Sequence, residues 1–121
     1  MVTKPEETPQ GVVALAFARA IAAGGYDLAH PMVSAPLQAT TSASQLEEEF
    51  IAMIEYAECP PENLPDVEVT EAMNDWPAKQ DGDVGWAYVA MSNDYYSEAV
   101  TVVVAHEDGS SVIREVEWGR P

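Results

Sequence analysis

The two histidines are the first residues to consider for chemistry. His30 precedes Pro31, and His106 follows a long apolar run. A transition-metal site uses two or three such ligands, helped by carboxylates, and the spacing here offers no such set. We therefore expect both imidazoles to be structural or exposed to solvent. Nothing in the sequence calls for a metal ion or an organic cofactor.

Cys59 is the only cysteine in the chain. A single thiol excludes an intrachain disulfide framework and any zinc site built from several cysteines. The spacing of serine, histidine and acidic residues does not define a catalytic triad or a Cys/His pair. We expect Cys59 to be buried or to lie at the end of a helix, without a nucleophilic role.

Two short acidic segments, 81–83 and 107–109, have a composition like that of calcium loops. Their sequences are Asp-Gly-Asp and Glu-Asp-Gly. Neither continues with the regular oxygen spacing and the closing glutamate of an EF-hand. Turns between strands explain both segments, and Gly109 is suited to the positive φ of a hairpin turn.

Aromatic side chains on the predicted strands are binding candidates. Trp86 and Tyr88 share the parity of Val84 and therefore lie on one face of a strand, and Trp118 ends the last strand. Such residues belong to a core more often than to a ligand platform. We expect core positions for all three and keep a pocket lining as the alternative.

Arg114 is a cation among apolar strand neighbours, in a chain with few cations. It would either orient an anionic ligand or form a structural ion pair with Glu98 or Glu115. We expect the ion pair, because a partly buried cation is normally paired.

The N-terminal half has the pattern of helices. Thr8-Pro9 is typical of a helix start, and residues 9–23 are apolar on nearly every side, so this helix should be covered all round. Residues 1–7 are expected to be a flexible leader. Gly24-Gly25 ends the helix, and residues 26–33 form a short second helix that stops near Pro31.

Residues 35–41 are expected to be a connection. Two overlapping capping boxes follow, Ser42 with Gln45 and Ser44 with Glu47. The next helix is amphipathic, carries a solvated acidic start, and should end at Cys59-Pro60-Pro61.

The C-terminal half has the pattern of a strand meander. We expect strands at 67–73, 84–91, 95–106 and 112–118, and their short connections require antiparallel pairing. Helices followed by strands predict one domain over 1–121 of the α+β class. In it, the N-terminal helices pack on a curved, cone-like antiparallel sheet of four strands.

Three segments carry a resemblance to a known superfamily. The sequence AAGGYDLA at 22–29 closes the first helix, Thr41-Ser42 opens the next long helix with Leu46 and Phe50 inward, and 84–118 forms the meander. Together they resemble the nuclear-transport-factor-two-like superfamily, also called the cystatin-like cone fold. Its members include isomerases, hydrolases, dehydratases, transport factors and immunity proteins.

The resemblance implies a pocket that opens near Tyr26, at the end of the first helix. The isomerases of this superfamily use a carboxylate base with tyrosine or protonated-acid donors in an apolar cavity. No such pair is assigned here, because Asp27 and Glu98 are no better placed than many other acids. The pocket candidates are Tyr26, Trp86, Tyr88, Arg114 and Trp118.

The charge of the chain limits its partners. Twenty-one acidic residues oppose five basic ones among 121, for a formal net charge of −16. Residues 1–60 hold two basic and eight acidic residues, and 61–121 hold three and thirteen, so both halves are negative. Such a surface repels nucleic acids and anionic membranes. The apolar run at 11–25 is interrupted by Arg19 and is short for a bilayer, so we expect a soluble, cytoplasmic protein.

Three functions fit these observations. The favoured one is a non-catalytic binding protein for a basic protein partner, as in immunity or inhibitor proteins, or for a small apolar or anionic ligand in a cone pocket. The alternative is a small pocket enzyme acting on an apolar substrate, which requires a cavity beneath Trp86 and Tyr88 with an inward carboxylate. A third is a protein of a salty cell interior, without a specific target. A homodimer through the apolar strand surface is also an expectation.

Overall fold

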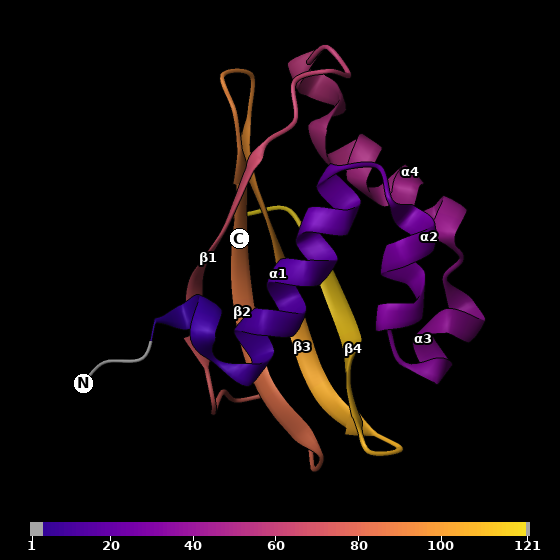
Figure 1. Cartoon of the computed structure of the whole chain (residues 1–121), viewed down its shortest axis with the longest axis vertical. Helices are drawn as coiled ribbons and strands as arrows, with labels where there is room; N and C mark the ends of the chain where they lie inside the picture. Colours follow the sequence, from indigo (N-terminus) through magenta and orange to yellow (C-terminus); the bar gives the residue numbers. More distant parts are fainter. Residues whose placement is uncertain (1–3, 121) are drawn as a thin grey trace.

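The computed structural model of the chain describes residues 4–120. Four helices and a curled sheet of four antiparallel strands make up the fold, which confirms the predicted α+β class. In Figure 1 helix α1 crosses one face of the sheet, and α2, α3 and α4 lie together beyond it on the side of β4. Among residues 4–120 no helix has the length and apolar character needed to cross a membrane.

Helix α1 (Pro9–Ala22) lies against the sheet and forms the centre of the core. Thr8 caps it, accepting a hydrogen bond from the Gly11 amide at 3.0 Å, and Pro9 occupies the first turn. Phe17 and Ile21 are fully buried. The expectation that this helix is covered all round is wrong, because Val12 is 57% exposed. Helices α2, α3 and α4 lie to one side of α1 (Figure 1), so they cover only part of the α1 surface that faces away from the sheet.

Residues 4–7 were expected to belong to the flexible leader. Pro5–Glu7 instead form a short 3-10 helix that contacts β1, and the Thr8 hydroxyl donates to the Pro5 carbonyl at 2.7 Å. Residues 1–3 lie outside the described part of the chain.

Helices α2 (Tyr26–Ala29) and α3 (Ala35–Thr40) are separated by a 3-10 turn at His30–Met32. The prediction that 35–41 is a connection is therefore wrong. Ser34 caps α3 by accepting from the Leu37 amide, and the Glu107 carboxylate accepts from the Ala35 amide at 3.0 Å. The second of these contacts comes from the distant β3–β4 hairpin, so local sequence could not reveal it.

Helix α4 (Ala43–Ile54) begins with the predicted capping box of Ser42 and Gln45. Ser44 lies within the helix, so the second candidate box does not cap it. The helix ends before the predicted stop at Cys59. A 3-10 turn at Glu55–Ala57 follows, and Glu58 then takes a left-handed conformation with φ 49°. Leu46 and Phe50 are buried, as expected.

The sheet has the order β1 (Asp66–Met73), β2 (Asp83–Ser92), β3 (Ser97–Glu107) and β4 (Ser110–Trp118). All neighbouring strands are antiparallel, and each of the three pairings contains one register shift. Such bulges increase the local bend and twist of a strand. They account for the curl that lets the sheet partly enclose α1.

The two faces of the sheet differ in what covers them. Ala87, Val89 and Met91 of β2 are fully buried in the core that α1 contacts. Trp86 and Tyr88 alternate with them and are partly exposed, so they lie on the opposite, outer face. The prediction of core positions is wrong for these two residues. It is supported for Trp118, which packs against the core with its ring 6.4 Å from that of Phe17.

Candidate functional site

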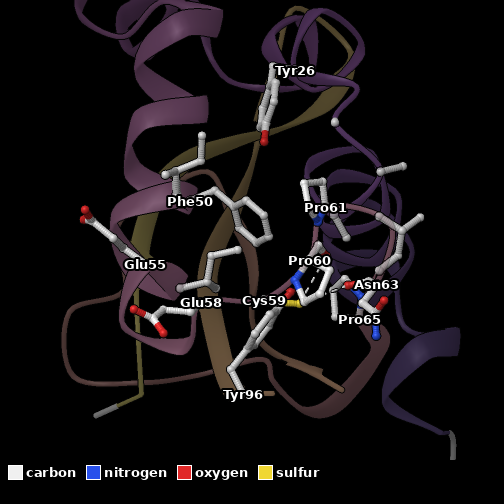
Figure 2. Close-up of a pocket in the computed structure, with 16 residues that line it drawn as sticks. Tyr26, Phe50, Glu55, Glu58, Cys59, Pro60, Pro61, Asn63, Pro65 and Tyr96 are labelled. Atoms are coloured by element: carbon white, nitrogen blue, oxygen red, sulfur yellow. Dashed lines mark hydrogen bonds between the residues drawn. The ribbon is translucent and has the colours of Figure 1, made fainter. Parts of the chain in front are cut away.

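A cavity of about 420 Å³ lies where the end of α1, the end of α4 and the β2–β3 hairpin approach one another. Its wall includes Ala22 and Tyr26 near the end of α1, Phe50 and Ile54 of α4, and Tyr96 of the hairpin. The loop 58–65 closes one side with three prolines. Figure 2 shows these elements around one shared space.

Two phenol groups, those of Tyr26 and Tyr96, line the cavity. In Figure 2 the Tyr26 hydroxyl points toward the space between Phe50 and Pro61, and the Tyr96 ring extends toward Cys59 from the other side. Burial raises the pKa of Tyr96 to about 12, and nearby Cys59 adds to the shift. Burial also raises the pKa of Tyr26, with a smaller effect from Glu47. Both phenols are therefore neutral near pH 7 and able to donate a hydrogen bond.

Two carboxylates belong to the rim of this cavity. Glu55 and Glu58 are exposed and line it, but in Figure 2 their carboxyl groups point away from the enclosed space. An acid–base reaction in the cavity would need a carboxylate directed inward, within hydrogen-bond reach of a substrate. The cavity therefore has an acidic rim, and in Figure 2 neither labelled glutamate is directed into it.

The loop that closes the cavity is held by hydrogen bonds around Cys59. The Asn93 amide donates to the Asn63 carbonyl at 3.0 Å and to Cys59 Sγ at 3.5 Å. Cys59 itself donates to the carbonyls of Pro60 and Asn63 at 3.4 and 3.5 Å. Cys59 thus has a structural position in the wall, and Asn93 ties the loop to the β2–β3 hairpin.

Arg114 does not reach the cavity. Its guanidinium makes a two-point contact with Asp83, with Nε 2.6 Å from Oδ1 and Nη2 2.7 Å from Oδ2. The expected ion pair is present, but its partner is Asp83, and neither Glu98 nor Glu115 takes that place. The positive charge of Arg114 is therefore balanced by the Asp83 carboxylate, so Arg114 is poorly placed to bind an anionic ligand.

The five predicted pocket residues are not brought together. Tyr26 lines the cavity, whereas Trp86 and Tyr88 line a different hollow on the outer face of the sheet. Trp118 lines a groove with Val116 and Leu46, and it shares a second, open hollow with Tyr88 but with none of the other three candidates. The enzyme hypothesis requires a cavity beneath Trp86 and Tyr88. The cavity of about 420 Å³ lies elsewhere, beside Tyr26 and Tyr96.

Sequence reasoning missed Tyr96 and the apolar rim. Tyr96 was assigned to an expected strand, but it is a turn residue with only 5% exposure. Two exposed apolar side chains at the rim are Ile51 and Leu64, with 47% and 58% exposure. The signals in the sequence that could have indicated this site are the proline-rich segment at 60–65 and the tyrosines of the turn at 93–96.

The histidines take structural or exposed positions. His30 Nε2 lies 2.7 Å from the Thr41 carbonyl, and His106 is exposed. Among residues 4–120 no group of three or more histidine, cysteine or acidic side chains has the arrangement of a metal site.

Comparisons of the chain with protein-family models, with curated proteins and with solved structures return no match. The resemblance to the nuclear-transport-factor-two-like superfamily therefore stays a prediction, and the site is interpreted from its own geometry.

Proposed function

We propose that this protein is a non-catalytic binding protein that holds a small, mostly apolar molecule in the cavity beside Tyr26 and Tyr96. The observation that carries the proposal is an apolar cavity of about 420 Å³ with two neutral phenols in its wall. Ligand sites of this size usually combine apolar walls with a few polar groups that orient the ligand. The position agrees with the pocket that the superfamily resemblance implies, and that assignment is part of the proposal.

The ligand chemistry follows from the lining. Phe50, Ile54 and the prolines would contact an apolar body, and the phenols would donate to a carbonyl or ether oxygen. An anionic ligand is disfavoured, because Glu55 and Glu58 stand at the rim and no lysine or arginine lines the cavity within residues 4–120. The pocket-enzyme alternative has less support, since both carboxylates turn outward. We also propose a cytoplasmic location, on the basis of the single cysteine and the uniform acidity.

A neutral apolar dye, N-phenyl-1-naphthylamine, tests the proposal through its fluorescence increase on entering an apolar site. Leu64 and Leu28 form a matched pair, because both are exposed leucines but only Leu64 lines the cavity. We expect Leu64→Ala to weaken dye binding by roughly threefold to tenfold, from the loss of apolar contact, and Leu28→Ala to leave it unchanged.

A second variant tests the role of the phenols. Tyr96→Phe keeps the ring and removes the hydroxyl, so it should leave dye affinity nearly unchanged. It should weaken a ligand of similar size that carries a ketone, such as 2-acetylnaphthalene, by roughly fivefold. Absence of dye binding, or equal effects of the two leucine variants, would refute the proposed cavity function.

A further inference from the structure

The outer face of the sheet carries a continuous row of four residues, one from each strand. Glu71 of β1 pairs in register with Tyr88 of β2, Tyr88 with Thr101 of β3, and Thr101 with Glu117 of β4. A carboxylate therefore stands at each end of the row, with an aromatic ring between them. Adjacent strands are about 4.8 Å apart, so the ends of the row are separated by roughly 14 Å.

A second aromatic ring enlarges the centre of this row. Trp86 stacks on Tyr88 with ring centres 6.3 Å apart and an angle of 22° between the planes. Both are only partly buried, and they form part of a hollow of about 310 Å³. The residues that line it are Thr70, Glu71, Trp86, Tyr88, Thr101, Glu117 and Gly119.

The charged side chains that line the hollow are Glu71 and Glu117, and both are negative. The nearby cation Arg120, which lines a neighbouring hollow with Tyr88 and Gly119, lies 3.8 Å from Glu98. Glu71 and Glu117 are exposed, and the ion pairs found within residues 4–120 involve other carboxylates, those of Asp83 and Glu98. Because Arg114 is held by Asp83, it does not neutralise the row. The hollow therefore combines open aromatic faces with carboxylates that a bound cation would pair with.

We propose that this row, Glu71–Tyr88–Thr101–Glu117 with Trp86, is a docking surface for an arginine-bearing segment of a basic partner protein. A guanidinium stacks on aromatic rings and forms two parallel hydrogen bonds with a carboxylate, which a lysine ammonium does not. An extended segment with arginines at both ends would reach Glu71 and Glu117 together. This surface is separate from the cavity, so the inference does not depend on the proposed ligand binding.

Charge decides between this partner and a second copy of the chain. Each copy has a net charge of −16, and the facing rows would bring Glu71 and Glu117 against like charges. Glu115 pairs in register with Val103 next to the row and adds to the repulsion. A cationic segment instead gains attraction from the whole surface, which also raises the association rate.

The test measures binding of the 121-residue chain to two fluorescein-labelled peptides by fluorescence anisotropy. One peptide alternates glycine and arginine, and the other alternates glycine and lysine at equal length and charge. At near-physiological salt, where long-range attraction is screened over about 8 Å, we expect the arginine peptide to bind at least roughly fivefold more tightly.

Matched charge variants locate the binding surface. Glu71→Gln with Glu117→Gln removes two charges from the row, and Glu48→Gln with Glu62→Gln removes two exposed charges elsewhere. We expect the first pair to weaken the arginine peptide roughly tenfold and the second by at most about twofold. Trp86→Leu should weaken it roughly fivefold, and circular dichroism would verify its folding.

Three results would overturn the inference. Equal losses from the two glutamine pairs would mean that the charge of the whole molecule, and not the row, attracts the peptide. Equal binding of the lysine peptide would exclude recognition of the guanidinium. A wild-type dimer in sedimentation velocity that Glu71→Gln with Glu117→Gln strengthens would assign the surface to a second copy. Since the glutamine variants change only exposed side chains, the test remains decisive if Trp86→Leu does not fold.

Discussion

At the scale of single residues, the Asp83–Arg114 ion pair joins β2 to β4 across β3. The Asp83 side chain is 1% exposed and that of Arg114 is 21% exposed, so water competes little for this contact. Hydrogen bonding by the Arg114 guanidinium is the main reason that the pKa of Asp83 lies below its usual range. The same contact raises the pKa of Arg114. The ion pair thus links β2 and β4, two strands that are not neighbours in the sheet.

Asp83→Asn should destabilise the protein by about 2 kcal/mol near pH 7, because it leaves Arg114 without its charged partner. The lowered pKa of Asp83 sets the pH dependence of this difference. The ion pair contributes fully to the free energy of unfolding above the ordinary carboxyl pKa of about 3.9. This contribution is lost as the pH falls through the lower pKa that Asp83 has in the folded protein. Urea unfolding of both proteins at neutral and acidic pH measures the difference.

The exposed neighbour Asp81 provides the control for this experiment. Asp81→Asn makes the same chemical change without loss of a salt bridge and should shift stability by less than about 0.5 kcal/mol. A difference between wild type and Asp83→Asn that stays constant down to acidic pH would contradict the assigned role of the ion pair.

The Tyr96 phenol should be among the last of the five tyrosines to ionise. Burial raises its pKa to about 12, from an ordinary value of 10.0, so folding favours the protonated form. Stability should consequently fall as the pH rises from about 10 toward 12. Ultraviolet absorbance titration of the phenolates should show a late transition that Tyr96→Phe removes. Tyr95→Phe, at a position 43% exposed, should leave that transition in place.

At the scale of elements, the contact between α1 and β2 depends on a glycine. A Cβ at Gly85 would stand 2.3 Å from Cδ of Gln10, which is too close for atoms that are not bonded. Gln10 is 1% exposed, and its amide donates to the Met73 carbonyl at 3.1 Å and to Asn74 Oδ1 at 3.0 Å. Gly85 thus makes room for a buried side chain that fastens α1 to the end of β1.

Gly85→Ala should destabilise the protein by about 2 kcal/mol, because the added methyl group overfills the α1–β2 contact. Gln10→Ala removes the side chain that the methyl group would strike, at the expense of its two hydrogen bonds. In the double variant the effect of Gly85→Ala should therefore shrink to less than about half. A double-mutant cycle from urea unfolding measures this coupling, and additive effects would show that the two residues do not compete for space.

At the scale of the whole molecule, the acidic residues repel one another across both halves of the chain. Glu47, Glu48 and Glu49 are consecutive and exposed on α4, and the C-terminal strands carry further carboxylates. The compact state brings these charges closer than the unfolded chain does. Stability should therefore increase with the ionic strength of the solution.

Raising NaCl from low concentration to about 0.15 M should stabilise the protein by on the order of 1 kcal/mol, because the Debye length shortens to about 8 Å. The unfolding midpoint in urea, measured along a salt series, tests this. A variant with Gln at 47, 48 and 49 should show a weaker dependence on salt. A midpoint that does not respond to salt would contradict self-repulsion as a cost of folding.

Local patterns predicted most of the elements but not all of them. Ser42 with Gln45 marked the start of α4, and the turn residues near Gly109 marked the β3–β4 hairpin, because caps and turns depend on a few neighbouring residues. Helix α3 was missed although Ser34 and Pro36 mark its start locally, and the further support from the Glu107 carboxylate of that distant hairpin has no local signal. The candidate site was predicted only through Tyr26, since Tyr96 reaches it from a turn far along the chain.

The sequence by itself determined the α+β class, the antiparallel order of four strands and the acidity of both halves. These features follow from composition, periodicity and short connections, which are properties of neighbouring residues. Only the tertiary structure decided which sheet face α1 covers, and therefore that Trp86 and Tyr88 lie outside the core. It also decided that Arg114 pairs with Asp83, and that α1, α4 and the β2–β3 hairpin enclose the cavity. These depend on strand register, bulges and the curl of the sheet, which bring together residues whose separation in the sequence carries no local signal.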